Sequence, residues 1–186
     1  MRVQIGKHLV QVWRGGLPGH FNSLSELADL SEAFGDLRDQ NDEDGSLFCV
    51  SVSLQFQTWP DLLVTQRFSP DVSGFDPGVL IVPETGVVLI GAGERLLAYR
   101  LDGPPVRLWE DAADAGFWWW DRQGEVILMA AELELAAWNL HGQKLWSSWA
   151  EPPWSYSVQN GVIQLDVMDN RSSFPVSTGP TKETLS

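Results

Sequence analysis

An internal repeat constrains the fold of this chain more than any other feature of its sequence. The segment GVLIVPETGVVLIGAGERLLAYRLDGPPVRLWE, residues 78–110, aligns with GFWWWDRQGEVILMAAELELAAWNLHGQKLWSS, residues 116–148. A third, degraded copy begins at WSYSVQNGVIQLDVMD, residues 154–169. A repeat of about forty residues, made of short apolar runs separated by turns, predicts a unit of four short strands that occurs more than once.

Matched residues place the turns of the repeat. Gly86 aligns with Gly124 and Gly161, and Glu94 aligns with Glu132. The segments LLAYRLDGPPVRLW and LAAWNLHGQKLW share an apolar strand, an aromatic residue, a Leu-x-Gly turn and a closing Leu-Trp. This pattern resembles β-propeller blades of the WD and quinoprotein-like kind, over about residues 78–169.

The resemblance implies a mainly β fold of antiparallel blade-like meanders. A propeller needs at least about four blades, and this chain has two clear copies and a fraction of a third. We therefore expect a partial propeller or a two-sheet sandwich, with one N-terminal helix. No ligand residue follows from the resemblance, because no cofactor or metal motif accompanies it.

The N-terminal helix is predicted by a change of hydrophobic period. In SLSELADLSEAFGDLRDQ the apolar residues recur at intervals of three and four, which predicts a helix from Leu24 to Leu37. From Leu47 the period becomes two, which is typical of strands. We expect one domain over residues 1–186, with a strand and helix region at 1–46, antiparallel β repeats at 47–176 and a tail at 177–186.

The tryptophan run at residues 118–120 aligns with the apolar strand VLIV of the first copy, so we predict that it is a strand. Strand alternation then places Phe117 and Trp119 on one face and Trp118 and Trp120 on the other. We expect both faces to be covered, the second by the predicted helix or the N-terminal strands. In the closing strands we expect Trp109 and Trp146 to occupy equivalent places, each covering the core of its own blade.

The charge balance excludes several partners. Twelve basic and 25 acidic residues leave a net charge of −13. Nucleic acids and anionic membranes are bound through clustered Lys and Arg, so neither is expected as a partner. A basic protein partner is compatible with this charge.

Cysteine content and hydropathy bear on the compartment. Cys49 is the only cysteine, which excludes an intramolecular disulfide and a Cys-rich zinc site, and its strand pattern predicts a small buried hydrophobe. No run approaches the roughly eighteen apolar residues of a membrane span, and the N-terminus lacks a signal-peptide core. A cytoplasmic location is expected.

No catalytic, cofactor or metal motif is found. Gly91 and Gly93 are interpreted as a hairpin turn or bulge, because the dinucleotide fingerprint needs a third small residue and a long helix. The acidic turn DQNDEDGS has Ser51 where a calcium loop needs a bidentate glutamate. Glu132 and Glu134, interpreted as sharing a strand face near Trp138, are the one carboxylate pair suited to glycoside hydrolysis.

We therefore expect a non-enzymatic acidic binding protein, neutralising a basic protein partner such as a bacterial toxin. Two alternatives stay open: a carbohydrate-active hydrolase using the paired glutamates, and a structural homo-oligomer, such as a homodimer, formed through open sheet edges. No catalytic residue, metal or cofactor is predicted. The candidate partner-binding residues are Trp118, Trp120, Glu132, Glu134, Trp138 and Trp154.

Overall fold

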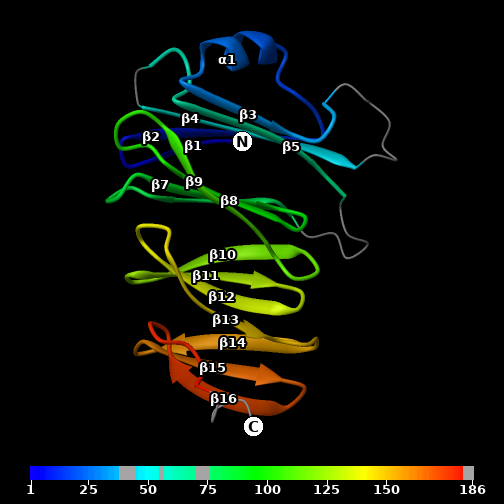
Figure 1. Ribbon diagram of the computed structural model, residues 1–186, viewed down its shortest axis with the longest axis vertical. Coiled ribbons are helices and arrows are strands. Elements are labelled where there is room, and N and C mark those ends of the chain that lie inside the picture. Colours follow the sequence, from blue (N-terminus) through cyan, green and yellow to red (C-terminus); the bar gives the residue numbers. More distant parts are fainter. Residues whose placement is uncertain (38–44, 55–56, 70–75, 182–186) are drawn as a thin grey trace.

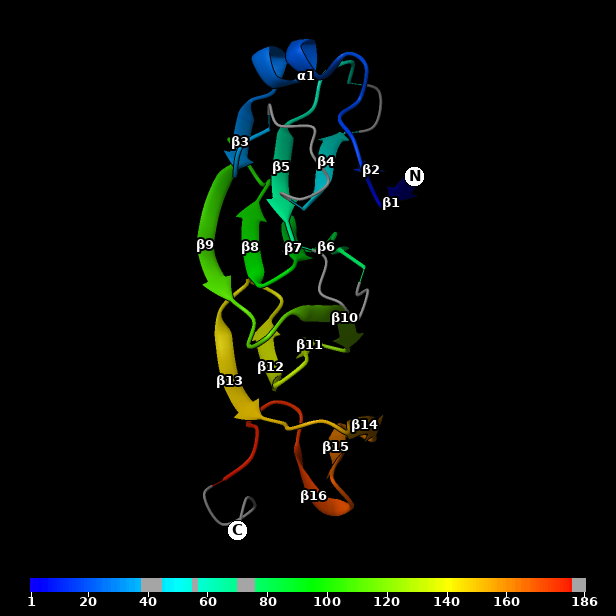
Figure 2. The same cartoon turned by 90° about the vertical axis from the view of Figure 1, so that its right-hand side faces the viewer.

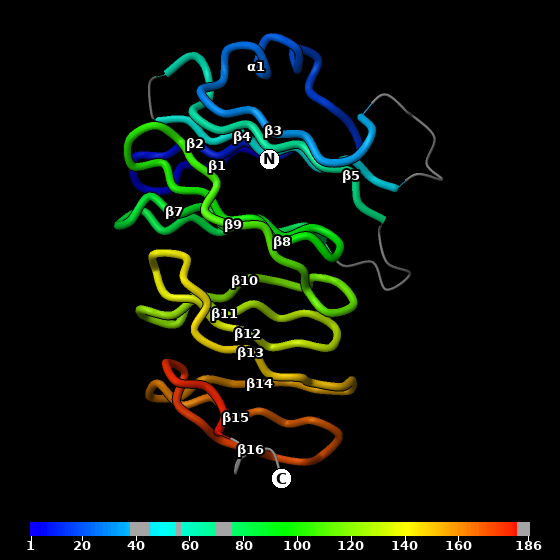
Figure 3. The backbone as a smooth tube through the Cα atoms, in the orientation of Figure 1, coloured from blue at the N-terminus to red at the C-terminus, as the bar shows by residue number. Residues whose placement is uncertain are grey.

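The computed structural model describes residues 1–37, 45–54, 57–69 and 76–181. Four β-sheets follow one another along the long axis of the molecule, with the N-terminal sheet at one end and the third repeat at the other (Figure 1). The chain runs through the stack in sequence order (Figure 3). Most of the predicted acidic turn DQNDEDGS lies outside the described residues.

Three of the sheets are the predicted repeats. The first blade contains β6 (Gly78–Val82), β7 (Val87–Ala92), β8 (Arg95–Arg100) and β9 (Val106–Ala112). The second contains β10 (Phe117–Gln123), β11 (Val126–Ala131), β12 (Glu134–Asn139) and β13 (Lys144–Trp149), and the third contains β14 (Trp154–Gln159), β15 (Val162–Val167) and β16 (Asn170–Pro175). Each is an antiparallel meander. The mainly β fold and the resemblance to propeller blades are thus confirmed, and the described strands form an open stack that does not close into a ring.

The N-terminal sheet has the strand order β1-β2-β4-β5-β3. Its strands are β1 (Arg2–Ile5), β2 (His8–Arg14), β3 (Leu30–Phe34), β4 (Ser46–Leu54) and β5 (Leu62–Phe68). β3 pairs with β5 in parallel, and the other pairings are antiparallel. The sheet therefore joins strands from both sides of the expected boundary at residues 46 and 47.

The predicted helix is wrong in its extent. Helix α1 covers Phe21–Leu27, whereas Leu30–Phe34 forms strand β3. The chain turns extended at Ala28, and the backbone N–H of Leu30 donates to the carbonyl of Asp61. Residues four apart lie on the same face of a helix and also on the same face of a strand. The spacing of Leu30 and Phe34 therefore fits either element, and pairing with β5 makes this segment a strand.

The sheets stack one after another along the long axis (Figure 2), and buried apolar side chains form the core clusters between them. Every residue of β7 and of β11 is buried, because each of these strands has a sheet on both sides. One core cluster joins the N-terminal sheet to the first blade, and there the Tyr99 hydroxyl donates to Glu32 Oε2 at 2.6 Å. Burial of apolar area between layers is thus the main source of cohesion.

Both ends of the stack are compatible with water. Helix α1 covers the far side of the N-terminal sheet, where Leu24 packs with the buried Cys49 and Leu63. This confirms Cys49 as a buried residue. In the third blade the residues that alternate with the buried ones are polar, for example Ser155, Ser157 and Gln164. Polar outer faces are how terminal repeats end such stacks.

The closing tryptophans occupy equivalent places, but each one packs on the next blade. Trp109 pairs with Ala98 and Trp146 with Ala137, each beside the same irregularity in the ladder. The Trp109 indole N–H donates to the Gly142 carbonyl, and that of Trp146 donates to the Val176 carbonyl at 2.7 Å. Each was expected to cover the core of its own blade; the structure shows that these side chains also contact the next blade and link the two.

The alternation predicted for the tryptophan run is also wrong, because β10 contains a bulge. Phe117 pairs with Ala131 and Trp119 pairs with Ala130, which leaves Trp118 as the extra residue. Trp118 and Trp119 consequently both face the third blade, with ring centroids 5.5 Å apart, while Trp120 joins Phe117 on the opposite face at 5.2 Å. The covering layers are the neighbouring blades and not the helix.

Candidate functional site: an acidic edge and an exposed aromatic cluster

Carboxylates collect along one edge of the stack. They lie in the turns between the second and third strands of the blades and in the connections from one blade to the next. We call these five residues the acidic edge: Glu94, Asp114, Glu132, Glu151 and Asp169. The turns from β11 to β12 and from β15 to β16 lie on the right in Figure 1, and this side faces the viewer in Figure 2.

The acidic edge is not neutralised by the protein itself. Four of its five residues are exposed and Glu132 is half-buried. Among the described residues, none of the five forms an ion pair, although nine ion pairs occur elsewhere. At the opposite edge, by contrast, Glu84 pairs with Arg122 at 3.0 Å and Asp102 with Lys7 at 3.3 Å.

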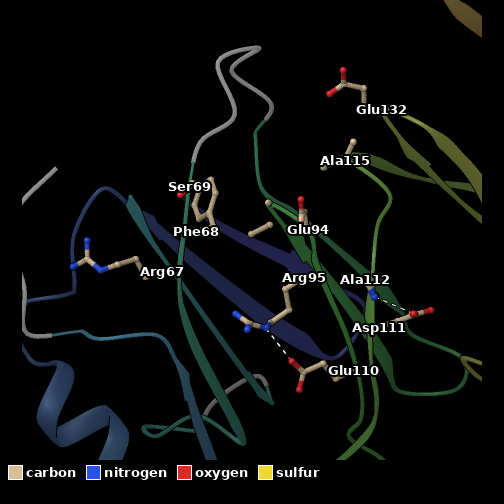
Figure 4. Close-up of a pocket in the computed structure, with 13 residues that line it drawn as sticks. Arg67, Phe68, Ser69, Glu94, Arg95, Glu110, Asp111, Ala112, Ala115 and Glu132 are labelled. Carbon is tan, nitrogen blue, oxygen red and sulfur yellow. Dashed lines mark hydrogen bonds and ion pairs between the residues drawn. The ribbon is translucent and has the colours of Figure 1, made fainter. Parts of the chain in front are cut away.

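A cleft of about 720 Å³ opens at the same edge, between the end of β5, the first blade and the second blade. Glu94 and Glu132 both line it, with the Ala115–Gly116 connection between the blades (Figure 4). The arginines of the cleft are engaged: Arg95 pairs with Glu110 at 3.0 Å, and Arg67 donates to the Asp36 and Gly45 carbonyls. The cleft thus extends the negative edge inward.

An aromatic cluster borders the acidic edge between the second and third blades. Trp118 stacks on Trp154 with centroids 5.1 Å apart and planes 8° apart, and Trp119 stacks on Trp118. The Trp154 indole N–H donates to the Glu132 carbonyl at 2.9 Å, which connects the cluster to the edge. Trp119 is 44% exposed and is the accessible member of the cluster.

Three of the predicted site residues meet at this place. Glu132 lies in the turn between β11 and β12, Trp118 is half-buried and Trp154 is buried beneath it. Of these, Glu132 and Trp118 have surface for a partner, while Trp154 supports them from below.

The other three candidates serve internal packing. Trp138 is 1% exposed, and Trp120 packs against it edge to face at 5.6 Å. The buried Glu134 carboxylate accepts a hydrogen bond from the Ser147 hydroxyl and lies 3.6 Å from Lys144 Nζ. Glu134 and Trp138 are thus buried, and the half-buried Trp120 packs against the core between the first and second blades.

The predicted pairing of Glu132 with Glu134 is not found. Glu134 begins β12, but Glu132 belongs to the preceding turn and lines the cleft, whereas the Glu134 carboxylate accepts a hydrogen bond from Ser147. Among the described residues, no group of three or more His, Cys, Asp or Glu could hold a metal ion. Within the same part of the chain, no helix has the length and apolar character needed to cross a membrane.

Sequence reasoning missed most of the acidic edge and the exposed Trp119. The repeat alignment contained part of the signal, since it matched Glu94 with Glu132, and extension to the third copy would have added Asp169. The exposure of Trp119 depends on the bulge at Trp118, for which the sequence carries no clear mark.

No family model and no curated protein matches this chain. Among solved structures, the computationally designed Ika8 protein is similar with a TM-score of 0.42 and 12% identity, over 74% of this chain and 44% of that chain. The WD40 β-propeller domain of Doa1 is similar with a TM-score of 0.41 and 13% identity, over 73% of this chain and 46% of that chain. This chain spans less than half the length of either, and neither likeness bears on function.

Proposed function

We propose that this protein is a non-enzymatic interaction module that binds a basic protein partner along its acidic edge. One observation carries the proposal: five carboxylates share one edge without an ion pair, whereas two acids of the opposite edge are paired. Like charges held together repel one another, and a cationic partner relieves that repulsion. Such a surface also accelerates encounter with a basic protein, in a salt-dependent way.

Tryptophans that border the acidic edge support the proposal. Trp119, on β10, is 44% exposed, and the half-buried Trp118 stacks on it. Aromatic residues are enriched in the centres of protein interfaces, where few residues supply most of the binding free energy. The charges would thus attract the partner and the aromatic rings would supply contact area.

A basic toxin neutralised by an acidic partner is one form of this proposal, and we place the interaction in the cytoplasm, where a reduced thiol such as Cys49 is ordinary. The homodimer alternative is less well supported. β16 is an edge strand of the third blade, but it carries the exposed Arg171 and Pro175, and a charge and a proline are typical protections of strand edges.

The proposal is tested by removing charge from the edge. A Glu94→Gln/Glu132→Gln/Asp169→Asn variant is compared with a Glu26→Gln/Asp29→Asn/Glu125→Gln variant, which loses the same three charges at exposed positions elsewhere. Binding of a fluorescein-labelled Lys/Arg peptide is followed by anisotropy at low and physiological ionic strength.

We expect the edge variant to bind about tenfold more weakly, since three surface charge contacts at about 0.5 kcal/mol each give that factor. The control variant should stay within about twofold of the unmodified protein. Equal weakening of both variants would show that only net charge matters and would overturn the proposed edge.

A further inference from the structure

Trp119 is held in a fixed orientation although nearly half of it is exposed. Its indole N–H donates to the Tyr156 hydroxyl at 3.2 Å, and this hydroxyl donates to Asp121 Oδ2 at 3.1 Å. Gln123 Nε2 donates to the same carboxylate oxygen at 2.9 Å. Four side chains from β10 and β14 therefore form one chain of hydrogen bonds that ends at the Trp119 ring.

The contacts of Trp119 leave part of its indole ring accessible. An indole N–H donates in the plane of the ring, so the Tyr156 hydroxyl lies at the edge of Trp119 and not above it. Trp118 covers one face of the Trp119 indole, with planes 27° apart. The Tyr156 ring also stacks on Trp119, with centroids 6.5 Å apart and planes 21° apart, and 44% of Trp119 remains exposed beside these two rings.

A carboxylate lies close to Trp119. Asp121 is two residues from Trp119 on the same side of β10, and both its Oδ2 and the Trp119 indole nitrogen are bonded to one hydroxyl. Within the described part of the chain, Asp121 has no cationic partner, and its hydrogen bonds use Oδ2 alone. The Oδ1 atom can accept hydrogen bonds from a ligand.

Burial raises the pKa of Tyr156 to about 12, and the Asp121 carboxylate adds to this effect. The tyrosine hydroxyl therefore remains protonated throughout the neutral range and continues to donate to Asp121. The arrangement is present before any ligand binds, which reduces the entropy that binding must overcome.

We propose that Trp119 and Asp121 form a binding site for an arginine side chain of the basic partner, with the guanidinium stacked on the indole and hydrogen-bonded to the carboxylate. This inference rests on the proposed function, because the net charge of −13 and the adjoining acidic edge favour a cationic ligand. A guanidinium is planar and weakly hydrated, so it can stack on a ring and donate sideways at once. An ammonium group has no flat face to stack.

The test uses Gly-Arg, Gly-Lys and Gly-citrulline repeat peptides of equal length. Titrations of protein carrying ¹⁵N-labelled tryptophan follow the indole N–H resonance of Trp119, assigned with a Trp119→Phe variant. Affinities are measured for Trp119→Ala, for the nearly isosteric Asp121→Asn, and for Trp149→Ala as the control at another exposed tryptophan. Circular dichroism confirms that each variant is folded.

We expect the Gly-Arg peptide to shift the Trp119 resonance and to bind at least about fivefold more tightly than the Gly-Lys peptide, with no binding of the citrulline peptide. Trp119→Ala and Asp121→Asn should each weaken Gly-Arg binding about fivefold, and Trp149→Ala should not.

Three results would overturn the arginine site. If Trp119→Ala binds as Trp149→Ala does while the edge variant loses affinity, the site is wrong and the proposed function stands. If a cello-oligosaccharide moves the Trp119 resonance and the Gly-Arg peptide does not, the aromatic face is a sugar platform. Retained Gly-Arg affinity in the edge variant and in Trp119→Ala alike would overturn both proposals.

Discussion

Replacing Trp146 by alanine should loosen the third blade from the second, because this side chain makes most of its contacts across that boundary. Its indole N–H donates to the Val176 carbonyl at 2.7 Å. Its ring meets Phe174 edge to face, with centroids 5.6 Å apart and planes 88° apart. It also covers Gly179 so closely that a Cβ there would lie 2.4 Å from the indole.

The magnitude follows from these contacts. Truncation of a core tryptophan to alanine costs about 3–5 kcal/mol, and Trp146 is half-buried, so we expect about 3 kcal/mol. The lost hydrogen bond accounts for about 1 kcal/mol and the edge-to-face pair for about another. Trp146→Phe keeps most of the ring area but leaves the Val176 carbonyl without its donor, and should cost about 1–2 kcal/mol.

Urea denaturation followed by far-ultraviolet circular dichroism gives these free energies. Trp149→Ala, in the same strand but 59% exposed, is the control and should cost less than about 1 kcal/mol. A loss below about 1 kcal/mol for Trp146→Ala would refute the idea that the closing tryptophans hold the blades together.

A second comparison separates the effect of the contact between Trp146 and Gly179 on stability from the effect of backbone strain. Gly103 and Gly179 both have positive φ, at 88° and 70°, so alanine is strained at either position by about 1 kcal/mol. A Cβ at Gly103 meets nothing within 4 Å, whereas at Gly179 it meets the Trp146 ring. Gly179→Ala should therefore be clearly the more destabilising of the two.

Three further predictions concern the core. Gly91→Ala should destabilise by about 1–3 kcal/mol in urea denaturation, because its Cβ would lie 2.5 Å from the Phe117 ring of the next blade. Burial raises the pKa of Cys49 to about 11, so the thiol should resist a disulfide reagent at pH 8 in the native protein and react fully in urea. Burial also lowers the pKa of His8, so the unfolded chain takes up a proton at a higher pH than the folded protein. The free energy of unfolding should therefore decrease as the pH falls below about 6.5, by at most about 1.4 kcal/mol per unit, and His8→Leu should reduce this slope between pH 7 and 5.

The repeat carried most of the fold that could be predicted from the sequence. The matched glycines and the closing Leu-Trp placed the strands of the first two blades correctly, because turns and strand ends have strong local requirements. Interblade packing was not predictable in the same way. Whether Trp109 contacts Gly142 depends on how the second blade packs on the first, and no local sequence pattern determines that packing.

Errors arose where two local explanations were equally good. Leu30 and Phe34 fit a helix or a strand, and a tertiary contact with β5 decided between them. In the tryptophan run, the extra residue at Trp118 interrupts the alternation of side chains. Relative to Phe117, Trp119 and Trp120 therefore lie on the faces opposite to those predicted. That bulge places Trp119 on the face toward the third blade, so sequence reasoning identified Glu132, Trp118 and Trp154 at the site but not Trp119.

The most direct test of the proposed function is a map of backbone amide chemical shifts as a Lys/Arg peptide is added to the protein. The account predicts that the largest changes fall in the turns and connections at residues 93–94, 113–116, 132–133, 150–151 and 168–169, and that the indole N–H of Trp119 shifts with them. Changes concentrated instead at the opposite edge, around Glu84 and Asp102, or on the polar outer face of the third blade would contradict it.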